Sequence, residues 1–459
     1  MSQSEERQRE PQLRRVMGPG LLLLFVISDI MGTGIYAMVG HVAAEVGGVA
    51  WLPFLVAFII ATVTAFSYLE LVTKYPQDAG AALYTQKAFR SPFLTFVVAF
   101  VVMSAGITSA ATAARFFAAN LVYALHLNSE RVTITVIALA FIMFLAAVNR
   151  RGVDQSLRLN VTLAIIEFSG LFLVLLVGVI AVAGGSHADF SRVVEFHSPG
   201  QQHFFLAFSA ATSLAFFAMT GFEDSANMVE ETKDPITVFP KVLLTGLSIA
   251  GVVYILIAIV SVALVPLAIL TTSDTPLVDV VEAGAPHLPI KDLLPYISMV
   301  AVSNTALVNM LMTSRLVYGM ARQGQLPPVL GTVGGVSRAP WVAIVFTTSI
   351  ALAVIIYVTV FIDRDSISIL GGTTSLLLLA VFAVVNLAVL VLRRDVRTPG
   401  SYFATPTALP VIGFLASLYL ISPLSGRPHQ QYQLAGLLLG AGVLLALIAK
   451  LVERRRTAR

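Results

Sequence analysis

The sequence predicts an all-α polytopic membrane protein with twelve transmembrane helices. Of its 459 residues, 57% are hydrophobic and 12% are charged, whereas a soluble protein carries about 25% charged residues. The apolar residues form successive runs of about 20, the length that crosses a hydrocarbon core of about 30 Å. The first and sixth runs are interrupted at glycines, which predicts that these two helices are discontinuous.

Twelve apolar runs define the expected spans, and the eleventh is the shortest. Their ranges are 18–42, 51–73, 93–124, 132–148, 159–183, 204–230, 241–266, 292–320, 341–361, 367–392, 408–422 and 432–451. No cleaved signal peptide is expected, because the first run is too long and no small-residue cleavage site follows it. The chain contains no cysteine, which excludes disulfides and thiolate chemistry.

The distribution of Lys and Arg predicts the orientation. With the N-terminus in the cytoplasm, most of the 29 Lys and Arg residues fall on the cytoplasmic side, as in most multi-pass proteins. The side chains expected outside are Arg131, Arg192, Lys291, Arg364 and Arg427. Trp51 and Trp341 each open a span, as interfacial anchors do. We therefore expect a multi-pass protein of the cell inner (plasma) membrane with both termini in the cytoplasm.

The interruptions lie at Gly32-Thr33-Gly34 in the first span and at Gly221 in the sixth. One such motif is weak, because small residues also let neighbouring helices approach closely. A pair, one in each half of the chain, indicates the binding site of a secondary transporter. The freed N–H groups after a break attract a carboxylate, and the freed carbonyls before it attract an ammonium or a small cation.

The second break lies five spans after the first, an odd step along the chain, so the broken helices are expected to run in opposite directions. This arrangement predicts an inverted five-plus-five repeat. The expected division is a cytoplasmic tail (1–17), a first repeat (18–183), a second repeat (204–392), two further helices (408–451) and a cytoplasmic tail (452–459).

Three acidic side chains lie at membrane depth, two next to the breaks and one in span five. They are Asp29 before the first break, Glu167 in span five, and Glu223 after the second break, next to Asp224. An acid inside a membrane costs roughly 2.5–3.5 kcal/mol on insertion scales, so each is a candidate for carrying a coupling proton. The alternatives are a structural hydrogen bond for Glu167 and a helix cap for Glu223.

Two further features accompany the breaks. Span eight carries a polar stripe that includes Ser303, Asn304 and Thr305, which would coordinate a cation, hydrogen-bond Glu167 or join neighbouring helices. Phe217, beside the second break, is a candidate gate, although apolar packing is the commoner role. The chain has no P-loop, HExxH or GxSxG motif, so we expect neither ATP use nor an enzyme.

Several short motifs resemble the amino acid–polyamine–organocation (APC) superfamily, and most closely bacterial permeases related to the cationic amino acid transporters. They are residues 32–36 (GTGIY), 76–84 (PQDAGAALY), 221–235 (GFE through EETKDP), 314–327 (SRLVYGMARQGQLP) and 397–400 (RTPG). Ala79 and Gln323 depart from the usual Gly and Asp. The resemblance covers essentially the whole chain, and the motifs occur in the correct order.

The resemblance implies the inverted-repeat fold and a substrate held at both breaks. The Gly32–Gly34 backbone would bind the carboxylate, while carbonyls near Ile30 and around Phe217 would bind the amine. Glu223 falls where some members carry a proton-sensing acid. Glu167 falls where several proton-coupled relatives carry a Lys in place of a sodium ion, so an acid here departs from that scheme. It would instead carry the proton or form a cation site with Asp29 and span eight.

The expected substrate-binding residues are Ile30, Gly32, Thr33, Gly34, Ile35, Phe217, Ala218, Thr220, Gly221 and Glu223. The expected ion-coupling residues are Glu167, Asp29, Glu223, Ser303 and Thr305. No catalytic residue, metal, cofactor or nucleic acid is expected.

The expected function is secondary active, proton-coupled amino acid transport by alternating access. Amino acid exchange, sodium symport and a non-transporting membrane sensor are the alternatives. The substrate's side-chain charge and the choice between monomer and homo-oligomer stay open.

Overall fold

The computed structural model describes residues 17–76, 80–151, 157–183, 188–198, 203–229, 231–334, 339–362, 366–394 and 402–457. Within these ranges every regular element is a helix. In the described part of the chain, eleven helical segments are long and apolar enough to cross a membrane, and one shorter apolar helix lies at residues Ala408–Ile421. These findings confirm the all-α, multi-pass fold class.

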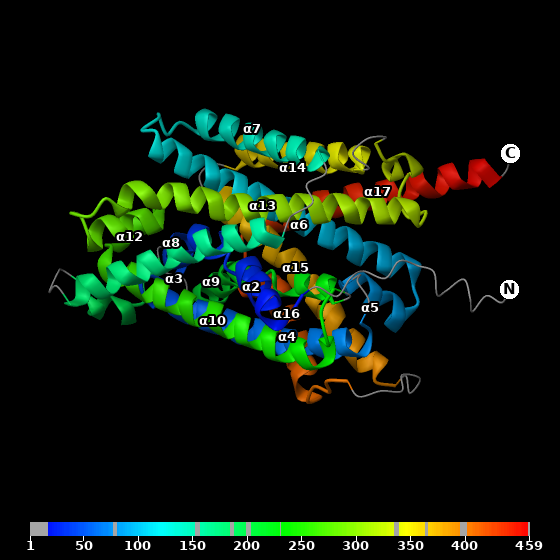
Figure 1. Ribbon diagram of the computed structural model, residues 1–459, viewed down its shortest axis with the longest axis horizontal. Coiled ribbons are helices and arrows are strands. Elements are labelled where there is room, and N and C mark those ends of the chain that lie inside the picture. Colours follow the sequence, from blue (N-terminus) through cyan, green and yellow to red (C-terminus); the bar gives the residue numbers. More distant parts are fainter. Residues whose placement is uncertain are drawn as a thin grey trace.

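The helices follow the expected spans closely (Figure 1). The bounds of those in the spans are α2 (Pro19–Ile30), α3 (Thr33–Val46), α4 (Trp51–Lys74), α6 (Pro92–Ala124), α7 (Arg131–Arg150), α8 (Leu157–Ala183), α9 (Phe204–Ala218), η3 (Phe222–Met228), α10 (Pro235–Leu264), α13 (Ile290–Arg322), α14 (Trp341–Phe361), α15 (Ser366–Leu392), α16 (Ala408–Ile421) and α17 (His429–Thr457). The shorter connecting helices are η1 (Gly48–Ala50), α5 (Gly80–Phe89), η2 (Phe190–Val194), α11 (Leu267–Leu270), α12 (Pro276–Gly284), η4 (Pro328–Gly331) and η5 (Pro423–Ser425).

Some helix boundaries differ from the expected ones for local reasons. The seventh span begins at Pro235 rather than at residue 241, because a proline at the first helical position lacks an N–H that would otherwise need a partner. The helix α16 has 14 residues, about 21 Å at 1.5 Å per residue, and is shorter than the hydrocarbon core. The motif at residues 397–400 and Glu230 lie outside the described residues.

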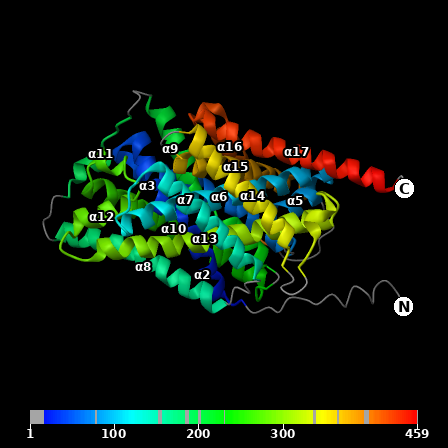
Figure 2. The ribbon, with the colours of Figure 1, turned by 90° about the horizontal axis from the view of Figure 1, so that it is seen from above.

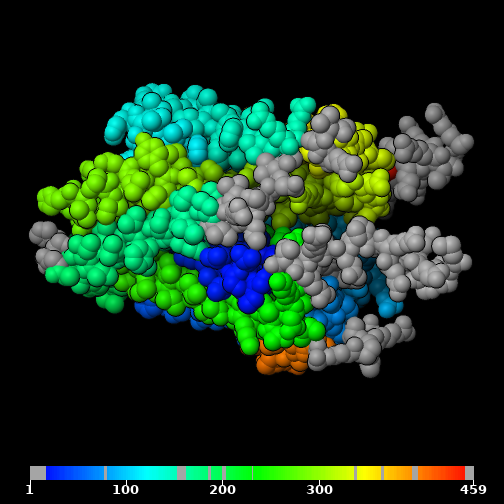
Figure 3. All heavy atoms as spheres, in the orientation of Figure 1, coloured from blue at the N-terminus to red at the C-terminus, as the bar shows by residue number. Residues whose placement is uncertain are grey.

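The spans form one bundle around a central group of helices. The helix α6 packs against both α13 and α15, whereas α7 and α14 pair with each other at one edge of the bundle (Figure 1). Turned by 90°, the molecule shows α17 along another edge, where it packs against α15 (Figure 2). The start of α2, dark blue in Figure 3, reaches the surface at Pro19.

The two interrupted spans pack against each other in a crossed order. The helix α3, after the first break, contacts α9, which precedes the second break. The helix α2, before the first break, contacts η3, which follows the second. This pairing places the two broken spans in opposite directions, as expected for the first and sixth spans, which have four spans between them.

Candidate substrate and ion site

The first break is a short uncapped gap between two α-helices. The helix α2 ends at Ile30, Met31 donates its N–H to the Ile27 carbonyl, and α3 begins at Thr33. Gly32 has φ −64° and ψ −137°, outside the helical region, and no side chain caps α3. The first N–H groups of α3 therefore form the positive end of a half-helix inside the bundle.

The second break closes on its own backbone. The helix α9 ends at Ala218, and the N–H groups of Met219 and Thr220 donate to the carbonyls of Phe216 and Phe217. Gly221 then takes φ +111°, a value that strongly favours glycine. The chain continues as the 3₁₀ helix η3, where an α-helix was expected. Glu223 Oε2 accepts the Gly221 N–H at 2.9 Å, although the N-cap residue of η3 is Gly221 and not Glu223.

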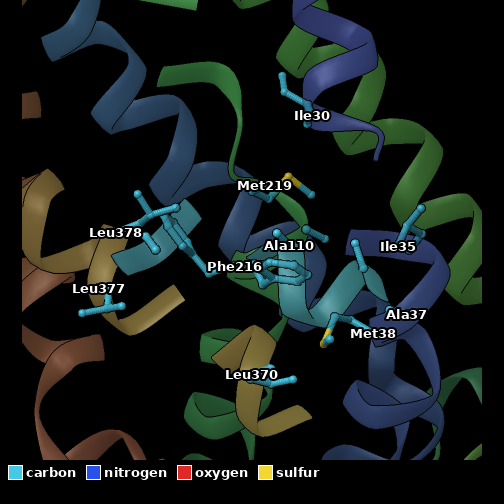
Figure 4. Close-up of a cluster of buried hydrophobic side chains, with 14 of the residues drawn as sticks. Ile30, Ile35, Ala37, Met38, Ala110, Phe216, Met219, Leu370, Leu377 and Leu378 are labelled. Atoms are coloured by element: carbon cyan, nitrogen blue, oxygen red, sulfur yellow. The ribbon is translucent and has the colours of Figure 1, made fainter. Parts of the chain in front are cut away.

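Glycines bring the two breaks into direct contact. A Cβ atom on Gly34 would overlap Ala218 at the end of α9. A Cβ on Gly221 would lie 2.6 Å from the Asp29 carbonyl oxygen. The breaks also share one cluster of buried apolar side chains, in which Ile30 and Ile35 flank the first break, and Phe216 and Met219 belong to the second (Figure 4).

A cavity of about 360 Å³ opens beside the breaks, within the usual range for small-molecule sites. Five of the expected site residues line it: Asp29, Thr220, Gly221, Glu223 and Thr305. The cavity extends between α5, α6, α13 and α15 toward the end of α13, where Gln323 and Gln325 lie. Among the described residues, its charged lining side chains are those of Asp29, Glu223, Asp224 and Arg315, so acids outnumber bases there.

The other expected substrate-binding residues lie behind this lining. The Ile30 carbonyl accepts a hydrogen bond from the Tyr254 hydroxyl at 2.6 Å, so α10 already occupies that acceptor. Phe217 is 4% exposed and packs next to Gly371 on α15. Gly32 packs against the Thr305 side chain on α13. Thr33 is also buried, and its hydroxyl has no partner among the described residues.

Glu167 lies at the centre of a second polar group that joins three spans. Its side chain on α8 is fully buried, and Oε2 accepts the Ser28 hydroxyl on α2 at 2.9 Å. Asn304 on α13 donates to Ser28 at 3.5 Å, and the Tyr36 hydroxyl donates to the Glu167 carbonyl at 2.9 Å. Span eight thus reaches Glu167 through Asn304, whereas Ser303 bonds to the Met299 carbonyl of its own helix.

Four buried polar atoms around the first break have no hydrogen-bond partner among the described residues. They are Asp29 Oδ2, Thr33 Oγ1, Glu167 Oε1 and Asn304 Oδ1. Buried polar atoms in native proteins nearly always have a partner, so such a group indicates a place for water, a proton or a small cation. Within the described ranges, no group of three or more His, Cys, Asp or Glu side chains is arranged to hold a metal ion.

Two residues that complete this site, Ser28 and Tyr254, were missed by the sequence analysis. Ser28 connects Glu167 to Asn304, a member of the polar stripe of span eight, and Tyr254 donates to the Ile30 carbonyl. Ser28 was detectable as a polar neighbour of Asp29. Tyr254 gave no signal, because one tyrosine in an apolar span is unremarkable without the structure.

The apolar spans, the paired breaks and the cavity define a multi-pass membrane transporter. The family model described as amino acid permease matches residues 22–444, and the chain belongs to this family. The branched-chain amino acid permease BcaP of Bacillus subtilis is 23% identical over 90% of this chain and 88% of its own. The methylthioribose transporter of Bacillus subtilis is 23% identical, covering 91% and 90%.

The chain is also similar to a plant protein named as a cationic amino acid transporter. The chloroplastic cationic amino acid transporter 9 of Arabidopsis thaliana is 25% identical over 70% of this chain and 58% of its own length. These relatives confirm the superfamily recognised from the motifs, and a transporter rather than an enzyme.

Proposed function

We propose that this protein is a secondary active transporter of amino acids that works by alternating access. The observation that carries the proposal is the contact between the two breaks, with Gly34 against Ala218 and Gly221 against the Asp29 carbonyl. The start of α3 lies directly behind the cavity lining, so an access state that opens this contact would let one ligand meet both the uncapped start of α3 and the acids of the cavity. The start of α3 suits a carboxylate and the acids suit an amine, which together describe an amino acid.

The lining acids favour an amino acid with a cationic side chain. Asp29 and Glu223 lie at the breaks, and Asp224 extends the acidic surface along η3. A second positive group on the substrate would neutralise charge that an apolar side chain would leave unpaired. A thermal-shift screen of the twenty amino acids and of polyamines tests this choice, because a bound ligand stabilises the folded state. Selective stabilisation by leucine, isoleucine or valine would instead assign a branched-chain substrate.

Coupling to protons is proposed for Glu167. Its unpartnered Oε1 lies in a buried group that connects α2, α8 and α13. A proton or cation bound there would bias the transport cycle if it binds the two access states with different affinity. Asp29, Thr305 and Glu223 are the nearest further candidates, since they line the adjoining cavity.

Uptake into proteoliposomes tests the coupling directly. An inward proton gradient should accelerate uptake into vesicles that contain no internal substrate. A requirement for internal amino acid would establish exchange, and loss of uptake when choline replaces sodium would establish sodium symport. Substrate binding without any flux under these conditions would indicate a sensor.

The inverted repeat and the orientation belong to the same proposal. The two repeats would comprise residues 18–183 and 204–392, and both termini would be cytoplasmic. In that orientation the cavity opens to the cytoplasm past Gln325. Because the chain has no cysteine, Gln325→Cys and Ser273→Cys give clean single labels. An impermeant maleimide added to intact cells should label only the cysteine at position 273.

A further inference from the structure

A second hollow lies on the side of α5 that faces away from the substrate cavity. It has a volume of about 540 Å³, and its lining residues are Tyr75, Leu83, Gln86, Lys87, Arg90 and Pro92. Among the described residues, the lining therefore contains two cations and no carboxylate. The substrate cavity, in contrast, is lined by α5 residues Gly80, Ala81 and Ala82. One short helix thus separates an acidic cavity from a basic hollow.

The two cations of the hollow are not neutralised by the described residues. The described salt bridges join other residues, namely Arg192 to Asp189, Lys291 to Glu282 and Arg393 to Glu70. The Lys87 ammonium lies 4.8 Å from the centre of the Tyr75 ring, which orients it without cancelling its charge. Arg90 is exposed and has φ +49°, an uncommon conformation for a residue other than glycine.

The positive charge of the hollow is reinforced by its position at the start of α6. This helix has 33 residues and begins at Pro92, so its positive dipole end faces the same space as Lys87 and Arg90. The hydroxyl oxygen of Ser91 caps only one N–H, that of Leu94. The positive charge of the hollow therefore comes from two side chains and the N-terminal end of α6, and each of these favours the binding of an anion.

Apolar groups accompany the cations on one side. Leu83 and Pro92 line the hollow, and Phe93, the next residue along α6, is 60% exposed. An exposed phenylalanine at the end of a membrane-spanning helix contacts lipid in the membrane. A ligand at this place meets cations and hydrocarbon together, which suits an amphipathic anion rather than a soluble one.

We propose that the hollow formed by Tyr75, Lys87, Arg90 and Pro92 binds the phosphate of an anionic phospholipid. The phosphate lies between Lys87 and Arg90, and the acyl chains extend over Phe93. The lipid holds α5 in place against α6, α15 and η3, with which this helix packs. The site is independent of the proposed transport function, because lipid binding is measurable whether or not the protein moves an amino acid.

The test is a titration of short-chain phosphatidylglycerol into the purified full-length protein in a neutral detergent, followed by thermal unfolding. We expect saturable stabilisation that phosphatidylcholine of the same chain length does not produce. The Lys87→Gln/Arg90→Gln variant should bind more than about tenfold more weakly, since each basic residue near an anionic lipid contributes about 1 kcal/mol. The charge-preserving Lys87→Arg/Arg90→Lys variant should retain most of the affinity.

Lys241→Gln is the matched control, since Lys241 is exposed on α10 and lies outside the hollow. Equal stabilisation of the wild type and Lys87→Gln/Arg90→Gln would overturn the proposal. An equal loss in Lys241→Gln would also overturn it, because it would show general attraction to charge. Inorganic phosphate is titrated in parallel. If phosphate stabilises the protein and this effect depends on Lys87 and Arg90, the ligand of the hollow is a soluble anion and the lipid proposal is overturned.

Discussion

In the described part of the chain, buried polar atoms around the first break lack hydrogen-bond partners, whereas backbone N–H groups at the second break are hydrogen-bonded within that break. Around the first, Asp29 Oδ2, Thr33 Oγ1 and Glu167 Oε1 are buried without a partner among the described residues. At the second, backbone N–H groups return to Phe216 and Phe217, and Glu223 accepts from Gly221. Two interruptions that look alike in sequence therefore differ in what they offer to a ligand.

From this difference we infer that the two breaks have separate roles in binding a ligand. The second break is a rigid corner that presents acids to the cavity, since its backbone is internally bonded. The first break keeps unsatisfied groups that a substrate, proton or cation would complete. Substitutions that fill a glycine, remove a titrating group or remove a single hydrogen bond should separate these roles.

The largest effect is expected for Gly221→Ala. The new methyl would meet the Asp29 carbonyl, and the residue would have to keep φ +111°, so we expect a loss of about 3 kcal/mol or more. Gly324→Ala is the matched control, because Gly324 has φ +75° with nothing within 4 Å of the added Cβ. Thermal unfolding measures both, and equal losses would show that the contact between the breaks contributes nothing.

The next effect tests the first break. Gly32→Ala would overlap Thr305 Oγ1 and should cost about 1–3 kcal/mol in the free energy of unfolding, as overpacking does. Thr305→Ala removes the hydroxyl and leaves Cβ atoms about 3.3 Å apart. The double variant should therefore recover most of the loss, and failure to recover would place the strain elsewhere.

Glu167→Gln should reduce proton-driven uptake about tenfold, equivalent to 1.4 kcal/mol. The amide keeps an oxygen that accepts from Ser28 but carries no exchangeable charge, so folding should be retained. Glu282→Gln serves as a control, since Glu282 pairs with Lys291 at the surface. Proteoliposome uptake with and without a proton gradient measures the effect. Normal gradient dependence in Glu167→Gln would assign coupling to another acid.

The smallest effect is expected for Tyr254→Phe. Loss of the hydroxyl leaves the buried Ile30 carbonyl unpaired and should cost about 1 kcal/mol of stability. Tyr432→Phe removes a similar bond, to the Ile421 carbonyl at 2.7 Å, far from the breaks in sequence. We expect substrate affinity to change less than about threefold in both, because we assign the Ile30 carbonyl to Tyr254, whose hydroxyl donates to it, rather than to the substrate. A selective loss of affinity in Tyr254→Phe would contradict that assignment.

Much of the fold could be predicted because a membrane-spanning helix requires a long run of apolar residues, which is visible in the sequence. Long apolar runs marked the spans, and Gly32 and Gly221 marked the interruptions. The short helices α11 and α12 and the 3₁₀ form of η3 were not foreseen. These elements depend on loop packing and on Glu223 bonding to Gly221, neither of which leaves a periodic pattern.

The sequence by itself determined which residues are costly in a membrane, and so identified Asp29, Glu167 and Glu223 as candidates. Only the tertiary structure decided their partners. In the structure, hydrogen bonds connect Glu167 through Ser28 to Asn304. The Tyr254 hydroxyl donates to the Ile30 carbonyl, and Asp29 and Glu223 line the same cavity. The physical reason is that burial cost is a property of each residue, whereas hydrogen bonds between spans depend on how distant helices pack.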